Sequence, residues 1–138
     1  MAAIAAAQAQ PVISGITPDG TVMFQPSGTL SFAASAPAGV TNISVQLNGT
    51  KLTGASFLKI YTTASGLTIA NADGGVQNAS APLIANIIYN ATITATDANG
   101  VSTTSTTAFD TISPSYTFEA EDFDFEGGQY IDNPQTNA

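Results

Sequence analysis

The sequence predicts an all-β fold in which two antiparallel sheets pack face to face as a sandwich. Apolar and polar side chains alternate along short runs of the chain, which is the pattern of strands with one buried face. Turn-forming Gly, Pro, Asn and Asp separate these runs about every eight to twelve residues. Lys and Arg, which favour helices, number two in 138 residues. We therefore expect roughly seven to nine short strands in one two-sheet domain.

The first strands are short and are separated by proline- and glycine-containing turns. A strand is expected over residues 12–17, followed by a short extended piece over 21–24 and a strand over 29–34. Leu30 and Phe32 are two residues apart, so they share the buried face of the third of these.

The next run predicts a hairpin. Ile43, Val45 and Leu47 alternate with polar residues, and the dipeptide Asn48-Gly49 that follows is a strong signal for a tight two-residue turn. The return strand is expected to begin at Lys51. Further strands are expected over 57–61, 67–70 and 79–83, with a turn over 71–75.

The stretch 84–109 carries the clearest strand pattern. Its apolar face is formed by Ile87, Tyr89, Ala91, Ile93 and Ala95. The opposite face carries Asn90, Thr92, Thr94 and Thr96, for which two interpretations stand: a polar binding face, or a surface that only keeps the domain soluble. The turn residues 97–100 and a Ser/Thr-rich run complete an antiparallel hairpin.

Residues 11–112 resemble bacterial immunoglobulin-like or fibronectin-type-III-like modules. The resemblance lies in the order of the strands, in the expected Asn-Gly hairpin after Leu47 and above all in residues 89–100, Tyr-Asn-Ala-Thr-Ile-Thr-Ala-Thr-Asp-Ala-Asn-Gly. It implies an immunoglobulin-like sandwich in which Tyr89 is the corner tyrosine and Ala91 occupies the place of the second cysteine. Because the chain has neither Cys nor Trp, the resemblance is to a relative without a disulfide.

Composition excludes several classes of function. Without His or Cys, the chain cannot build a Ser-His-Asp or Cys-His nucleophile or an ordinary zinc site. Its net charge is −8 and its only cations are Lys51 and Lys59, so neither nucleic acid nor an anionic membrane is an expected partner. No run approaches the ~18 apolar residues of a membrane span, so we expect no membrane insertion.

The two ends of the chain differ from the middle. Residues 1–10 are alanine-rich, and Ala7-Gln8-Ala9 fits the pattern before a signal-peptidase cut, so this segment is either the tail of a signal peptide or an N-terminal arm. Residues 113–116 contain Pro114 and are expected to be a linker. The rest of the chain, 117–138, is expected to be an extended C-terminal extension, and it holds six of the ten acidic residues.

Residues 116–134 resemble the opening of family 6-like carbohydrate-binding modules, and the Phe-Glu-Ala-Glu-Asp-Phe core at 118–123 is the specific part. The resemblance implies that 117–138 is the truncated start of such a module, and that Glu119 and Glu121 are candidate calcium ligands in the intact parent protein. Calcium takes six to eight oxygen ligands, more than this segment supplies. The other interpretation is a solvated acidic strand or a disordered tail left over from a missing domain.

Two further patterns in the acidic segment are weaker. The start of an EF-hand loop is imitated from Asp122 onward, but its twelfth position is Asn133 in place of Glu. A glycosidase-like pair of carboxylates would need an enclosing pocket that this segment cannot build alone.

These observations lead to one expected function and one alternative. The chain is expected to be a non-catalytic spacer module of a secreted, carbohydrate-associated multidomain protein, located outside the cell or at its surface. Its partners would be the adjacent domains of the same chain, and polysaccharide would be bound by the downstream module. The alternative is a surface adhesin or a cell-surface immunoglobulin-like repeat, in which the sandwich itself adheres or bears load.

Overall fold

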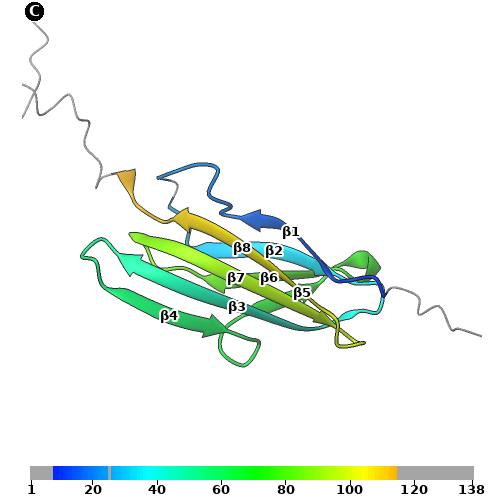
Figure 1. Cartoon of the computed structure of the whole chain (residues 1–138). Helices are drawn as coiled ribbons and strands as arrows, with labels where there is room; N and C mark the ends of the chain where they lie inside the picture. Colours follow the sequence, from blue (N-terminus) through cyan, green and yellow to red (C-terminus); the bar gives the residue numbers. More distant parts are fainter. Residues whose placement is uncertain (1–7, 25, 115–138) are drawn as a thin grey trace, which may run out of the picture.

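The structure, a computed structural model, describes residues 8–24 and 26–114 and confirms the all-β class. Its elements are β1 (Val12–Thr17), β2 (Thr29–Ser35), β3 (Val40–Lys51), β4 (Ser56–Tyr61), β5 (Thr68–Asn71), the 3-10 turn η1 (Asp73–Gly75), β6 (Gln77–Pro82), β7 (Ile87–Asp97) and β8 (Ser102–Asp110) (Figure 1).

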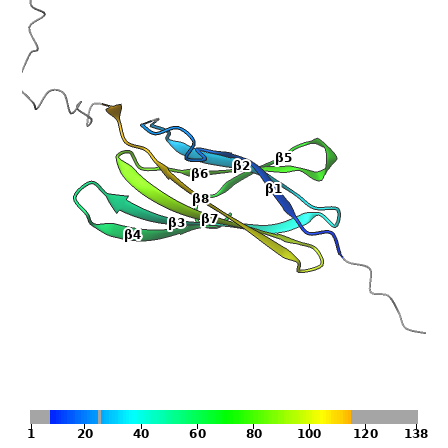
Figure 2. The ribbon, with the colours of Figure 1, turned by 45° about the horizontal axis from the view of Figure 1, so that its top comes forward.

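The strands form two four-stranded sheets in which every pairing is antiparallel. One sheet has the order β1-β2-β6-β5 and the other β4-β3-β7-β8. Figure 2 shows them as two packed layers. If the strands are lettered A, B, C, C′, D, E, F and G along the chain, the sheets read A-B-E-D and C′-C-F-G, the arrangement of immunoglobulin-like sandwiches. The predicted two-sheet antiparallel sandwich is therefore confirmed.

The core lies between the sheets and follows the predicted alternation. Every second residue of β7 from Ile87 to Ala95 is at most 3% exposed, as expected for the apolar face of this strand. The facing sheet contributes Leu30 and Phe32 from β2, and β3 contributes Ile43, Val45 and Leu47. These side chains supply the apolar burial that stabilises the fold.

The central pair of the second sheet is β3 and β7. Their register extends from Val40 opposite Asp97 to Lys51 opposite Ile87, with one irregularity between Val40 and Asn42. The β7–β8 hairpin predicted for 97–100 is also present, and Gly100 there has a positive φ of 79°.

The predicted hairpin at Asn48-Gly49 is wrong. Both residues lie inside β3, where Gly49 pairs with Tyr89 on one side and Phe57 on the other. The chain turns later, where the amide of Lys51 donates to the carbonyl of Ala55 over 2.8 Å and Gly54 has a φ of 86°.

Gly49 is needed because the Phe57 ring occupies the place of a side chain, and it does not form a turn. A Cβ at this position would lie 2.9 Å or less from three ring atoms of Phe57. The Phe57 ring therefore lies over the glycine, and its edge meets the Tyr89 ring at a centroid distance of 6.2 Å and an interplanar angle of 88°. From sequence this glycine predicts a turn, but in the structure its missing side chain leaves room for an aromatic ring.

The extended piece predicted over 21–24 is also not a strand. These residues belong to the loop between β1 and β2, which is held against β8 by a 3.0 Å hydrogen bond from Thr107 Oγ1 to the carbonyl of Asp19. Val22, Met23 and Phe24 remain exposed there, because no neighbouring strand pairs with the loop.

The packing of the Phe57 ring over Gly49 can be tested with Gly49→Ala. The added methyl group collides with the ring, so we expect a loss of about 1–3 kcal/mol in the free energy of unfolding, measured by chemical denaturation. Gly28→Ala is the matched control, because a Cβ there has nothing within 4 Å and should change stability by less than about 0.5 kcal/mol. Equal stability of the two variants would contradict this packing.

Candidate functional site

The candidate calcium ligands Glu119 and Glu121 lie outside the described residues, and so does the whole of 117–138. Within residues 8–24 and 26–114, no group of three or more Asp, Glu, His or Cys side chains is placed to hold a metal ion. The metal assignment therefore stays a prediction about the downstream segment.

Asp97 is a buried carboxylate with a structural role. It is 2% exposed, and its Oδ1 accepts hydrogen bonds from the amides of Asn99 and Val101, each over 2.9 Å. These bonds close the turn between β7 and β8. Asp97 thus acts on the hairpin backbone.

The outer surface of the β4-β3-β7-β8 sheet is the polar face considered from sequence. Here Asn90 lies opposite Asn48, and Thr92 lies opposite Gln46. Hydroxyl groups also bond to each other across strands, from Thr94 to Thr104 over 3.2 Å and from Thr96 to Ser102 over 2.7 Å. Thr–Thr and Thr–Ser pairs of this kind stabilise sheets. The face is hydroxyl- and amide-rich, and part of its hydrogen-bonding capacity is used within the sheet.

The most extensively hydrogen-bonded site lies where the chain leaves the sandwich. We call it the exit corner and define it by Ile84, Asn86, Ile87, Tyr89 and Thr111. Thr111 is fully buried; its Oγ1 donates to the carbonyl of Ile84 over 2.7 Å and accepts from the amide of Ile87 over 3.1 Å. One side chain thereby joins the residue after β8 to the β6–β7 loop.

Backbone hydrogen bonds reinforce the exit corner. The amide of Thr111 donates to the carbonyl of Ile87, and the amide of Asn86 donates to the carbonyl of Thr111, both over 2.9 Å. Asn86 adopts a positive φ of 60°, and its Oδ1 accepts from the amide of Ser113 over 3.0 Å. The chain is therefore held to the sandwich as far as Ser113.

Tyr89 ties the same corner to the core. Its hydroxyl oxygen accepts a 3.0 Å hydrogen bond from the amide of Ile84, five residues upstream, which is the geometry of a corner tyrosine. Its ring packs between Phe57 and Phe109. Burial raises the pKa of Tyr89 above its ordinary value of 10.0, although the bond to Ile84 acts in the opposite direction.

Sequence reasoning placed Tyr89 but missed Thr111 and Asn86. Thr111 is one of many threonines, and its only sequence signal is that it shares the parity of the inward-facing Phe109. Asn86 lies in the stretch 84–109 ahead of the alternating pattern, which gives no sign of the left-handed backbone with which it ends the β6–β7 loop. Neither role could be identified without the partner in the folded chain.

A scan against protein-family models and a search of curated proteins both found no match to this chain. In the part of the chain that the structure describes, no helix has the length and apolar character needed to cross a membrane.

The exit corner can be tested by replacing Thr111 with its near-isostere, Val. Thr111→Val removes the donor to Ile84 and the acceptor for Ile87 at a buried position, so we expect the free energy of unfolding to fall by about 1–3 kcal/mol.

Thr103→Val is the matched control. The Thr103 hydroxyl is also buried but has no hydrogen-bond partner among the described residues, so the same substitution should be neutral or stabilising by up to about 1 kcal/mol. Thermal and urea unfolding give the free energy of unfolding of both variants. A Thr111→Val protein as stable as the Thr103→Val control would show that the exit corner does not hold the chain.

Proposed function

We propose that the chain is a non-catalytic spacer of a secreted, carbohydrate-associated multidomain protein. It would hold the domains on its two sides apart, and polysaccharide would be bound by the module that begins in 117–138. The observation that carries this proposal is that the described chain enters the sandwich at one end, before β1, and leaves it at the other, after β8.

The strand register supports that placement. Val12, the first residue of β1, pairs with Ser35, and the loop after Ser35 leads to Val40, which lies opposite Asp97. At the other end, Ile88 lies opposite Asp110, the last residue of β8. Figures 1 and 2 agree that the chain enters at one end and leaves at the other.

The distance between these ends follows from the length of β7. A strand rises about 3.3 Å per residue, so 11 residues span about 36 Å. Both sheets run along this axis, and the hydrogen bonds of the exit corner fix the direction in which the chain leaves. A domain attached beyond Ser113 would therefore be held at a set distance from one attached before Pro11.

The surface of the sandwich supports a spacer more than an enzyme or a nucleic-acid binder. Its outer sheet face carries amides and hydroxyls together with the exposed Leu58 and Ile60 of β4. Its two lysines cannot neutralise a row of phosphates. Secretion is proposed from the Ala7-Gln8-Ala9 pattern and from a polarity carried by Ser, Thr and Asn rather than by charge.

The proposal predicts that this chain does not bind polysaccharide. In affinity electrophoresis through gels with soluble polysaccharides, with and without calcium, we expect its mobility to equal that in a plain gel, because the described sandwich exposes no aromatic platform on its polar face.

Retention in any of these gels would contradict the spacer assignment. If Asn90→Ala together with Thr92→Ala removed the retention, the polar face itself would be adhesive and the adhesin alternative would hold. Retention that depends on calcium and is lost with Glu119→Gln and Glu121→Gln would instead assign the binding to the C-terminal segment.

A further inference from the structure

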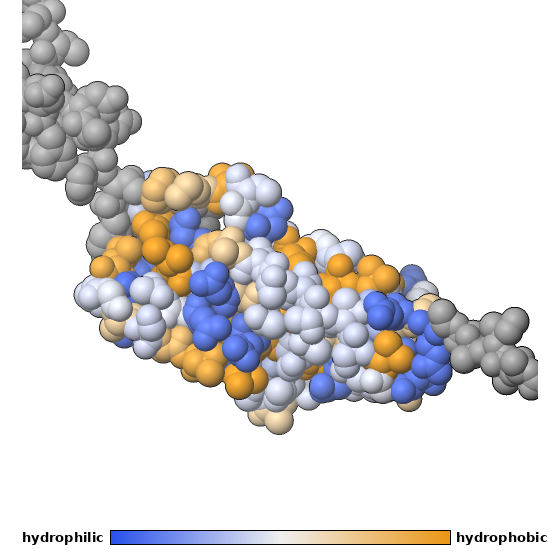
Figure 3. Space-filling model, viewed as in Figure 1, coloured by the Kyte–Doolittle hydropathy of each residue, from blue (hydrophilic) through white to orange (hydrophobic). Residues whose placement is uncertain are grey.

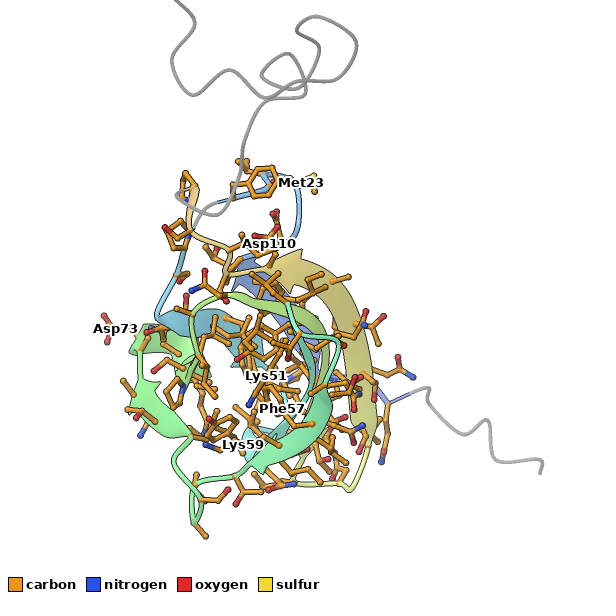
Figure 4. All side chains as sticks on the ribbon, turned by 90° about the vertical axis from the view of Figure 1, so that its left-hand side faces the viewer. Met23, Lys51, Phe57, Lys59, Asp73 and Asp110 are labelled. Atoms are coloured by element: carbon orange, nitrogen blue, oxygen red, sulfur yellow. The ribbon has the colours of Figure 1, made fainter. Side chains whose placement is uncertain are left out.

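An apolar pocket of about 280 Å³ opens beside the exit corner. We call it the exit pocket and define it by Val22, Met23, Ile88, Phe109 and Ile112, which line it. Asp110 also contributes to the wall of the pocket. Figure 4 labels Met23 and Asp110, which lie at the same end of the molecule.

The exit pocket is surrounded by apolar side chains that water reaches. Met23 is 67% exposed, Val22 53% and Ile88 48%. Of the nine exposed large hydrophobic residues in the described chain, five come from the β1–β2 loop and from the stretch 84–88 that flanks the exit, namely Val22, Met23, Phe24, Ile84 and Ile88. Apolar residues also gather at this end in Figure 3. Exposed apolar side chains that gather around a pocket in this way are typical of an interaction surface.

The wall of the pocket is held in place before anything binds. A Cβ at Gly20 would overlap the carbonyl oxygen of Ala108, so the loop backbone lies directly on β8. Thr107 Oγ1 adds its hydrogen bond to the Asp19 carbonyl, and Asp19 Oδ1 accepts from both the amide and the hydroxyl of Thr21, over 3.0 and 2.7 Å. The first of these Thr21 bonds is the main cause that lowers the pKa of Asp19.

The chain itself leads from this pocket to a group of aromatic residues. Ile112 forms part of the wall, and the described chain ends two residues later at Pro114. Residues 115–138 contain five of the eleven Phe and Tyr residues of the whole chain. The first two, Tyr116 and Phe118, are two residues apart, a spacing that would place both on one side if the segment were extended.

We propose that Tyr116 and Phe118 fill the exit pocket. Phe118 is four residues beyond Pro114, which gives a reach of about 13 Å in extended backbone, enough to return to a pocket whose wall includes Ile112. Burying aromatic and pocket surface together stabilises the contact by roughly 25 cal/mol per Å² of apolar area.

The tether favours this occupant over a second copy of the chain. A short linker raises the effective concentration of the segment at the pocket to about the millimolar range, well above a typical solution concentration of the protein. Charge favours the same two residues. The acidic side chains begin at Glu119, so Tyr116 and Phe118 can enter a pocket bordered by Asp110 while the carboxylates stay in water.

This contact would make the joint after the sandwich stiff, because the linker would be bound at both the exit corner and the exit pocket. The inference does not depend on the spacer function, since it concerns two parts of one chain. The experiment below detects the contact between the aromatic residues and the exit pocket, whereas the polysaccharide gels detect binding of glycan.

The chain offers a selective probe, because it has only two methionines, Met1 and Met23. We would label the full chain with ¹³C-methyl methionine and assign the two signals with Met23→Leu. Rings of Tyr116 and Phe118 in the pocket should shift the Met23 methyl signal and give nuclear Overhauser contacts from this methyl group to their ring protons.

The decisive comparison is between two full-length variants. In Tyr116→Ala with Phe118→Ala, the Met23 signal should move and the ring contacts should vanish, whereas Tyr130→Ala, the matched control, should leave both unchanged. An identical Met23 signal in the wild type and the double variant would overturn the proposal. A shift that disappears on dilution would also overturn it, because the occupant would then be another copy of the chain.

Discussion

The hydrogen bonds of Thr111 and Tyr89 with Ile84 and Ile87 are the constraint on which the exit end of this molecule depends. Thr111 closes β8 onto Ile84 and Ile87, and Tyr89 holds Ile84 from within the core. Because all of these groups are buried or partly buried, each bond replaces a hydrogen bond to water that folding removes. The direction in which the chain leaves is thereby set by the same packing that forms the core.

The polar surface of the sandwich is formed mainly by uncharged Ser, Thr, Asn and Gln side chains. Cross-strand hydroxyl pairs such as Thr94 with Thr104 satisfy each other on the outer sheet surface, and the buried Asp97 is used to close a turn. A surface of this kind has few groups that could steer charged ligands, since interactions at a distance depend on net charge fields. The exposed large apolar side chains of the described residues gather most at the exit end, and others lie on β4 at Leu58 and Ile60.

The parts of the fold that were predictable from sequence are those that follow from the alternation of apolar and polar side chains or from local turn residues. The alternation through Ile87, Tyr89 and Ala91 placed β7 and its buried face, because side chains in a strand alternate between faces. The turn at 97–100 was predictable because Asp97 accepts hydrogen bonds from nearby amides and Gly100 tolerates a positive φ, and both effects are local in sequence.

The parts that were missed depend on tertiary partners. Gly49 looks like a turn residue until the Phe57 ring is placed over it, and residues 21–24 look extended until they are seen as a loop on β8. Thr111 carries no local signal at all, since its role comes from Ile84, 27 residues away. The candidate site was therefore less predictable than the fold, because its geometry arises from groups distant in sequence.

The claim that the entry and the exit of the sandwich are held apart by a rigid body can be tested directly by double electron–electron resonance spectroscopy. The chain has no cysteine, so Gln10→Cys and Pro114→Cys would carry the only two spin labels, both at exposed positions. The length of β7 predicts a single narrow distribution centred at roughly 35–45 Å, including the reach of the labels. A broad distribution, or one centred below about 25 Å, would contradict a spacer whose ends lie at opposite poles of the sandwich.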